Sequence, residues 1–206
     1  MSSNFEATRD YISSTGDIDI LVSFAEKEAI DQNEDNRLLF LKLGVVNNVT
    51  KFQVFIENLL KEFKYLLINS GKKHKDLPIH IRLNCIKKIS EEYIISKKLL
   101  HPQQFTVDKL SEVSNIIDGY NSLCNENASI KEDFKFTTKF PMGKNGLGEL
   151  IKLFKQVEGI DIFENAPFDS YKINEILGRR HSIIHEDSNP HLTEVVIIEY
   201  KEYLIK

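Results

Sequence analysis

Apolar residues recur every three or four positions through much of the chain, the spacing that places side chains along one face of an α-helix. The longest series comprises Leu38, Leu41, Val45, Val49, Phe52, Ile56, Leu59, Phe63 and Leu66. Its steps alternate irregularly between three and four, so it predicts one long helix of about 40 Å with a continuous buried face. The run Asn69-Ser70-Gly71 predicts where this helix ends.

The same spacing predicts shorter helices at residues 17–30, 78–100, 106–117, 145–157, 170–185 and from 193 onward. Asp17 and Thr193 are suitable N-terminal caps, whereas Pro102 and Gly159 follow expected helix ends. Residues 134–140 alternate between apolar and polar, which fits a short strand or an extended loop. Because no second strand is predicted for it to join, an extended loop is favoured.

These elements together predict an all-α fold, a helical bundle with one long central helix and several shorter helices. The chain has 206 residues, of which 41% are hydrophobic, enough for a substantial core. No internal repeat and no linker is visible, so a single domain spanning residues 1–206 is expected.

Charge and terminal composition narrow the class of protein. The formal net charge of −4 argues against a protein that coats nucleic acid through general positive charge. The N-terminus has neither a basic start nor an apolar run, and no stretch approaches the roughly 18 apolar residues of a membrane span. Cys85 and Cys124 lack the spacing of a zinc site or redox pair, so both are expected to be buried thiols. A cytoplasmic location without membrane association is therefore expected.

One segment breaks the helical pattern. Around Arg180, the apolar residues Ile173, Ile176, Leu177, Ile183 and Ile184 form one stripe on a helical wheel, and Arg180 falls in its middle. Arg179 is expected to point to solvent, and His181 and His185 to stack one turn apart along the edge of the stripe. A guanidinium on a core-facing stripe costs several kcal/mol unless it is paired or faces a cleft.

Three interpretations of this segment need no catalytic role for Arg180 and the histidines. Arg180 pairs with a buried carboxylate, for which Glu57 on the long helix is the obvious candidate. His181 and His185 form a pair favoured by the dipole at a helix end. Alternatively, these histidines bind zinc with help from Glu186, Asp187 and His191, although the metalloprotease pattern requires Glu where Ser182 stands.

The run Arg180-His181-Ser182-Ile183-Ile184-His185 resembles the R-x4-6-H motif of HEPN domains. The chain is most similar to bacterial HEPN proteins of the ribonuclease-toxin and phage-defence type. Those proteins share a long early helix, a loop and helix like residues 141–147, and a motif-bearing helix near the C-terminus. The resemblance covers residues 35–206, with residues 1–34 as an N-terminal helical extension.

The resemblance implies a metal-independent endoribonuclease that needs no cofactor, with its active site at a homodimer interface. His185 is then the general base for a ribose 2′-hydroxyl, Arg180 stabilises charge on the phosphate, and His181 assists. Five residues separate Arg180 from His185, so they point about 140° apart on one helix, and two helices facing across a two-fold axis would combine them. RNA, an antitoxin or a defence-system protein are the implied partners of such a toxin or antiviral effector.

The alternative is a catalytically inactive HEPN module that binds RNA or a partner protein. A weaker indication of RNA binding is a segment in which lysines alternate with phenylalanines: Lys131, Phe134, Lys135, Phe136, Lys139, Phe140 and Lys144. Either the phenylalanine rings stack on bases, or they fill the end of the bundle while the lysines stay in solvent. The run Lys72-Lys73-His74-Lys75 is interpreted as a solvated loop.

Overall fold

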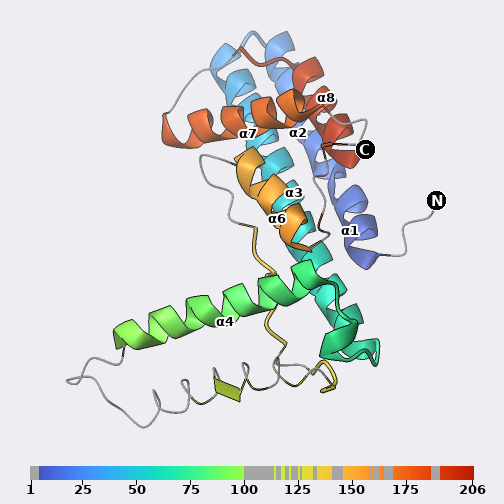
Figure 1. Ribbon diagram of the computed structural model, residues 1–206. Coiled ribbons are helices and arrows are strands. Elements are labelled where there is room, and N and C mark those ends of the chain that lie inside the picture. Colours follow the sequence, from blue (N-terminus) through green and yellow to red (C-terminus); the bar gives the residue numbers. More distant parts are fainter. Residues whose placement is uncertain are drawn as a thin grey trace. The chain divides into compact units, whose positions relative to one another are not determined.

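The computed structural model describes residues 5–99, 114, 117–118, 121, 125, 127–131, 134–140, 146–157, 159, 163–164, 169–186 and 191–206. Its helices are α1 (Glu6–Ser14), α2 (Gly16–Ile30), α3 (Glu34–Asn69), α4 (Ile79–Leu99), α6 (Gly146–Val157), α7 (Ser170–His185) and α8 (Glu194–Ile205), with a short 3-10 helix η1 (His74–Asp76) (Figure 1). Regular structure in these residues is helical, so the predicted all-α class is confirmed. Most of the helix expected at 106–117 lies outside the described residues, and so does Cys124.

The chain divides into two compact units. Unit 1 comprises Met1–Glu62, Phe140–Lys152 and Ile162–Lys206, and unit 2 comprises Phe63–Lys139 and Leu153–Asp161. Two of the four boundaries between the units fall inside helices, one in α3 and one in α6, so the chain passes between the units there without a linker. A single domain for the whole chain stays a prediction.

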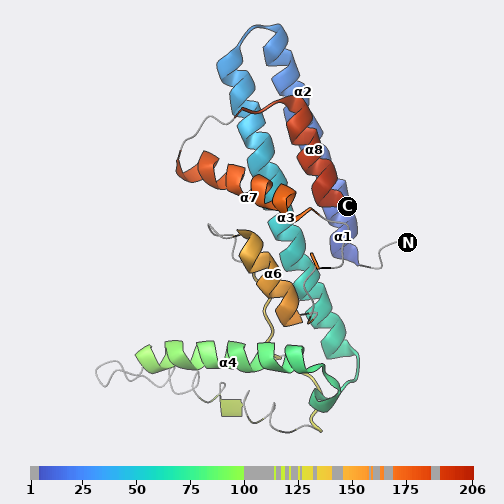
Figure 2. The ribbon, with the colours of Figure 1, turned by 45° about the horizontal axis from the view of Figure 1, so that its top comes forward.

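In unit 1, α8 packs along α2, and both lie beside α3 (Figures 1 and 2). The core between these helices includes Ile18, Val22, Leu41, Val45, Val49, Ile197 and Tyr200, all buried. Gly44 permits the close approach of α8, because a Cβ at this position would lie 2.9 Å from Cγ2 of Ile197. The α3 stripe is buried as predicted from Leu41 to Ile56, but it then continues through Leu60 and Leu67, whereas Leu66 is exposed.

Helix α1 lies within the N-terminal helical extension that the resemblance implied. The residue before it, Phe5, provides no side-chain cap. Instead the Glu62 carboxylate accepts hydrogen bonds from the backbone N–H groups of Glu6 and Ala7, at 2.9 Å each. Tyr11 then stacks on Phe55 of α3, with ring centroids 4.7 Å apart. Both attachments join α1 to α3.

Unit 2 contains α4 and residues 134–139. The segment 134–140, whose last residue Phe140 belongs to unit 1, has no regular secondary structure and is the extended loop that the sequence favoured. Its Phe136 ring contacts Phe63 at the end of α3, and the backbone N–H of Thr137 donates to Asn84 of α4. Cys85 is buried as expected, and this burial raises the pKa of its thiol to about 12.

Helix α3 is the one described helix that is long and apolar enough to cross a membrane, with a mean hydropathy of 1.2 over its best 18-residue window. No stretch of this kind was expected from the sequence. Length and composition alone are weak evidence for a membrane span, since the core helix of a soluble protein also passes this test. Here α3 contributes buried residues from Leu41 to Leu67.

Candidate functional site

The candidate motif lies on α7, whose bounds match those predicted. The helix begins at a local cap, because the Asp169 carboxylate accepts a hydrogen bond from the backbone N–H of Tyr171 at 2.9 Å. Ile173, Ile176 and Leu177 form its buried face. Leu177 packs against α6 so closely that a Cβ on Gly146 would lie 2.9 Å from its Cδ1. These contacts fix which side of α7 faces the core.

Arg180 follows Leu177 on that face and is half-buried. Its Nε atom is buried and has no hydrogen-bond partner, and the side chain forms no ion pair with any described residue. The expected partner Glu57 is engaged elsewhere, since its Oε1 accepts from the backbone N–H of Phe140 at 3.2 Å and from Gln53 at 3.4 Å. The proposed Arg180–Glu57 pair is therefore wrong, and the Arg180 charge is uncompensated by any described acid.

The apolar stripe ends sooner than predicted. Ile183 is half-buried, and Ile184 is 44% exposed, so the stripe is buried only N-terminal to Arg180. The C-terminal end of α7 projects beyond the neighbouring helices of unit 1 (Figures 1 and 2). Arg180 consequently stands where the buried face gives way to solvent, rather than in the middle of a buried stripe.

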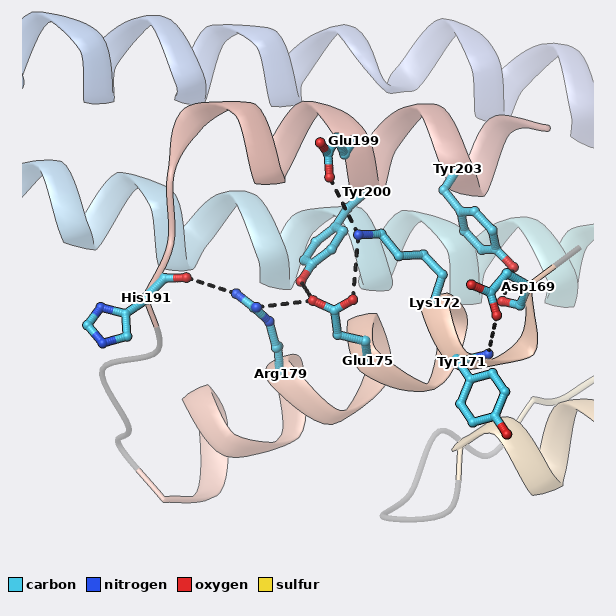
Figure 3. A network of polar contacts seen from close by, with 9 residues as sticks. All are labelled: Asp169, Tyr171, Lys172, Glu175, Arg179, His191, Glu199, Tyr200 and Tyr203. Carbon is cyan, nitrogen blue, oxygen red and sulfur yellow. Dashed lines mark hydrogen bonds and ion pairs between the residues drawn. The ribbon is translucent and has the colours of Figure 1, made fainter.

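Arg179 does not point freely to solvent, contrary to the wheel (Figure 3). Its guanidinium pairs with Glu175 at 3.0 Å and donates to the backbone oxygen of His191 at 3.0 Å. It also lies over the ring of Tyr200, 5.7 Å from the centroid. As the helical wheel predicted, Arg179 lies on the side of α7 that faces away from α3 and α6. That side is nevertheless not free, because α8 covers it.

Tyr200 and Glu175 form the centre of this network between α7 and α8. The fully buried Tyr200 donates its hydroxyl to Glu175 Oε1 at 2.6 Å, and Lys172 lies 3.5 Å from Glu175 Oε2. The hydrogen bond from Tyr200 lowers the pKa of Glu175, and the charges of Lys172 and Arg179 add to this effect. Burial, followed by the bond to Glu175, raises the pKa of Tyr200. Arg179 thus has a charged partner, whereas its neighbour Arg180 has none.

His181 and His185 lie next to one another one turn apart as predicted, with ring centroids 4.7 Å apart, but their rings are tilted by 45° and are not stacked. His181 is half-buried and His185 is exposed at the last residue of α7. The third histidine of the segment, His191, contributes only its backbone oxygen to the network, and its imidazole points away from Arg179 (Figure 3). No group of three potential metal ligands occurs among the described residues, to which Asp187 does not belong.

The aromatic residues of segment 134–140 are not a base-stacking surface. Phe134, Phe136 and Phe140 are all buried, and the rings of Phe134 and Phe136 pack on one another at 6.2 Å. Of the two interpretations left open, the one in which the rings fill the interior is confirmed for the three phenylalanines, whereas Lys135 is half-buried. Lys139 and Lys131 are exposed, and Lys144 lies outside the described residues.

Sequence reasoning missed the Glu175–Tyr200–Arg179 network entirely. The sequence contains a signal for part of it, because Lys172, Glu175 and Arg179 follow one another at steps of three and four, the spacing of one helix face. Nothing local indicates that Tyr200 faces them. A contact between residues of two helices requires the packing to be known.

No protein-family model matches this chain, and neither a curated protein nor a solved structure matches it. The resemblance to HEPN domains therefore depends on the motif from Arg180 to His185 and on the helices around it.

Proposed function

We propose that this protein is a metal-independent endoribonuclease of HEPN type, acting in the cytoplasm as a toxin or antiviral defence effector. The observation that carries the proposal is the environment of Arg180. Its permanently charged guanidinium has no ion-pair partner among the described residues, while the neighbouring Arg179 is fully engaged. An unpaired, half-buried arginine is a suitable group for binding a phosphate.

The proposed reaction needs a base and an anion-stabilising group. The His185 imidazole accepts the proton of a ribose 2′-hydroxyl, and the 2′-oxygen forms a bond to the adjacent phosphorus. The bond from phosphorus to the 5′-oxygen of the next nucleotide breaks, and that oxygen takes up a proton. Arg180 stabilises the negative charge on the phosphoryl oxygens, with His181 assisting. The products are a 2′,3′-cyclic phosphate and a 5′-hydroxyl end, and no cofactor is consumed.

The proposal includes a homodimer. Arg180 is half-buried and His185 is exposed, as expected for side chains about 140° apart around one helix. A single α7 does not direct both side chains at one phosphate, whereas two copies of α7 facing across a two-fold axis do so. Each active site then takes its arginine from one protomer and its histidine from the other.

The dimer arrangement makes a specific prediction for mixed mutants. Arg180→Ala and His185→Ala are each expected to be inactive alone, but mixing them after subunit exchange should restore up to about a quarter of wild-type activity, because half of the dimers then contain one intact site. RNA cleavage by the mixture measures this. Activity that stays absent after demonstrated exchange of subunits contradicts a site shared between protomers.

The reaction itself is tested with purified full-length protein and total RNA in the presence of EDTA. Wild-type protein should cleave RNA to fragments with cyclic phosphate and 5′-hydroxyl ends, and His185→Ala should lower the rate by at least about 100-fold. An exposed His185 at the end of α7 can be substituted without loss of folding, which circular dichroism checks. Fragments with 5′-phosphate ends, or cleavage abolished by EDTA, contradict the mechanism.

A second candidate function is an inactive HEPN module that binds RNA or a partner protein such as an antitoxin or a defence-system component. The charge of unit 1 favours it, since the unit that contains α7 has 13 Lys and Arg against 20 Asp and Glu. Net negative charge weakens the attraction of RNA to the surface around Arg180. Folded wild-type protein that cleaves no RNA, but captures a protein through α7, supports this candidate.

A further inference from the structure

Two segments of unit 2 that are distant in the sequence come together to form an edge with four lysines. Residues 71–76 and 127–131 are joined by an isolated antiparallel bridge between Lys73 and Ser129. Backbone hydrogen bonds run from His74 to Ala128 at 3.1 Å and from Ile130 to Lys72 at 3.2 Å. The basic edge, as we name it, consists of Lys72, Lys73, Lys75 and Lys131, all of which are exposed.

The backbone of this edge is firmly held. His74 is buried and its ring packs against Phe134, 5.9 Å between centroids. Asp76 closes the turn, because its Oδ2 accepts from the backbone N–H of Lys73 at 3.0 Å. The short helix η1 between these residues is anchored while the lysine side chains extend into solvent. A fixed backbone lowers the entropic cost of binding through those side chains.

The lysines of the basic edge have no ion-pair partner in the described part of the chain. In unit 1, by contrast, Lys51 pairs with Asp17 at 2.7 Å and Lys201 pairs with Asp19 at 2.6 Å. The Asp76 carboxylate keeps its charge and accepts the backbone N–H of Lys73, but it forms no ion pair with the lysines of the basic edge. Glu132 and Asp133 follow Lys131 in the sequence and lie outside the described residues.

The distribution of charge between the units agrees with this local observation. Unit 2 has 14 Lys and Arg against 11 Asp and Glu, whereas unit 1 has 13 against 20. The acidic balance of the whole chain therefore arises in unit 1, and unit 2 is net basic. A basic unit within an acidic chain is a common signature of a surface that contacts a polyanion.

We propose that the basic edge binds the phosphate backbone of single-stranded RNA, holding phosphates other than the one that is cleaved. This inference rests on the proposed function, which makes RNA the polyanion concerned. Since the phenylalanines of the adjacent segment 134–140 are buried, the edge offers charge without base stacking. Its binding should be independent of base sequence, and four lysine–phosphate contacts should give log Kd a slope of about 3 against log salt.

Binding is measured by fluorescence anisotropy with a labelled single-stranded RNA, using the full-length His185→Ala protein so that no cleavage occurs. In that background, K72E/K73E/K75E should weaken binding at least about 10-fold and make the salt slope shallower by about 2. The matched control K27E/K61E/K206E changes the same charge at exposed lysines of unit 1 and should alter affinity less than about 3-fold. Should the glutamate triple variant fail to fold, K72Q/K73Q/K75Q is measured, with the same change in slope expected.

Equal weakening by the two triple variants, or an unchanged salt slope, overturns the proposal. So does a protein that binds heparin or anionic vesicles through these lysines but does not bind RNA. The result is separable from that of the cleavage assay, because RNA binding is measured without turnover. If the protein cleaves RNA but its RNA affinity is unchanged by substitutions in the basic edge, only this inference is refuted. If the wild-type protein does not cleave RNA but its RNA affinity falls when the basic edge is substituted, only the proposed reaction is refuted.

Discussion

The two adjacent arginines of α7 have opposite environments. Arg179 has a carboxylate, a backbone oxygen and an aromatic ring as partners, whereas Arg180 has a buried Nε atom without a hydrogen bond. A buried polar group without a partner lowers the stability of the folded state. The sequence placed Arg180 correctly on the apolar side of α7, but it expected the buried stripe to continue beyond Arg180 and it expected Arg179 to be free in solvent. A helical wheel contains no information on α8, the helix that covers Arg179.

Stability measurements on two methionine variants distinguish the structural contribution of Arg179 from that of Arg180. Arg179→Met should lower the free energy of unfolding by about 1–3 kcal/mol, because it removes a charge-assisted pair with Glu175 and a bond to His191. Arg180→Met should leave it within about 0.5 kcal/mol or raise it, since methionine fills the same space without an unpaired charge. Urea denaturation followed by circular dichroism measures both. A loss of several kcal/mol in Arg180→Met means that Arg180 has a structural partner.

At the level of single helices, most elements with local signals were predicted well, but Asp17 is not the cap of α2, which begins at Gly16 after Thr15. Asp169 and Thr193 cap α7 and α8 through their own side chains, and Gly159, with φ at 75°, follows the end of α6. The start of α1 was not predicted, because its cap is Glu62, 56 residues away in the sequence. A cap supplied by another helix leaves no local pattern for sequence analysis to detect.

The distant cap of α1 gives a prediction at the element scale. Glu62→Ala should destabilise α1 by about 1 kcal/mol, because two backbone N–H groups lose their acceptor. Faster amide hydrogen exchange confined to residues 6–14 is the expected result. As a control, Lys61→Ala on the exposed side of α3 should leave that exchange unchanged. Equal exchange in the two variants contradicts a capping role for Glu62.

At the scale of the whole molecule, contacts between distant segments decide the arrangement of each unit. In unit 1, Arg37 of α3 binds the Glu194 carboxylate at the start of α8 through two hydrogen bonds of 2.7 and 2.8 Å. In unit 2, residues 71–76 pair with residues 127–131. Neither contact follows from hydrophobic periodicity, which specifies the buried face of an element and not its partner. The all-α class was therefore predictable, whereas the two units and the basic edge were not.

The Arg37–Glu194 pair gives a pH dependence of stability. The hydrogen bond from Arg37 lowers the pKa of Glu194 in the folded state, so the pair's contribution is present above the unfolded pKa and is lost as pH falls through the folded pKa. Glu194→Gln should lower the free energy of unfolding by about 1–2 kcal/mol at pH 7, and by less at acidic pH. Denaturation of both proteins at neutral pH and below pH 4 measures this. A difference that does not shrink in acid contradicts the assignment.

RNA cleavage by Arg180→Met shows whether Arg180 is available to a phosphate or is needed for the fold. The same RNA, in EDTA, is incubated with wild-type protein and with Arg180→Met at equal folded concentration. We predict that the variant keeps wild-type stability and loses RNA cleavage by at least about 100-fold, because the phosphate loses its charged donor. A stable Arg180→Met protein that cleaves RNA at the wild-type rate contradicts the account.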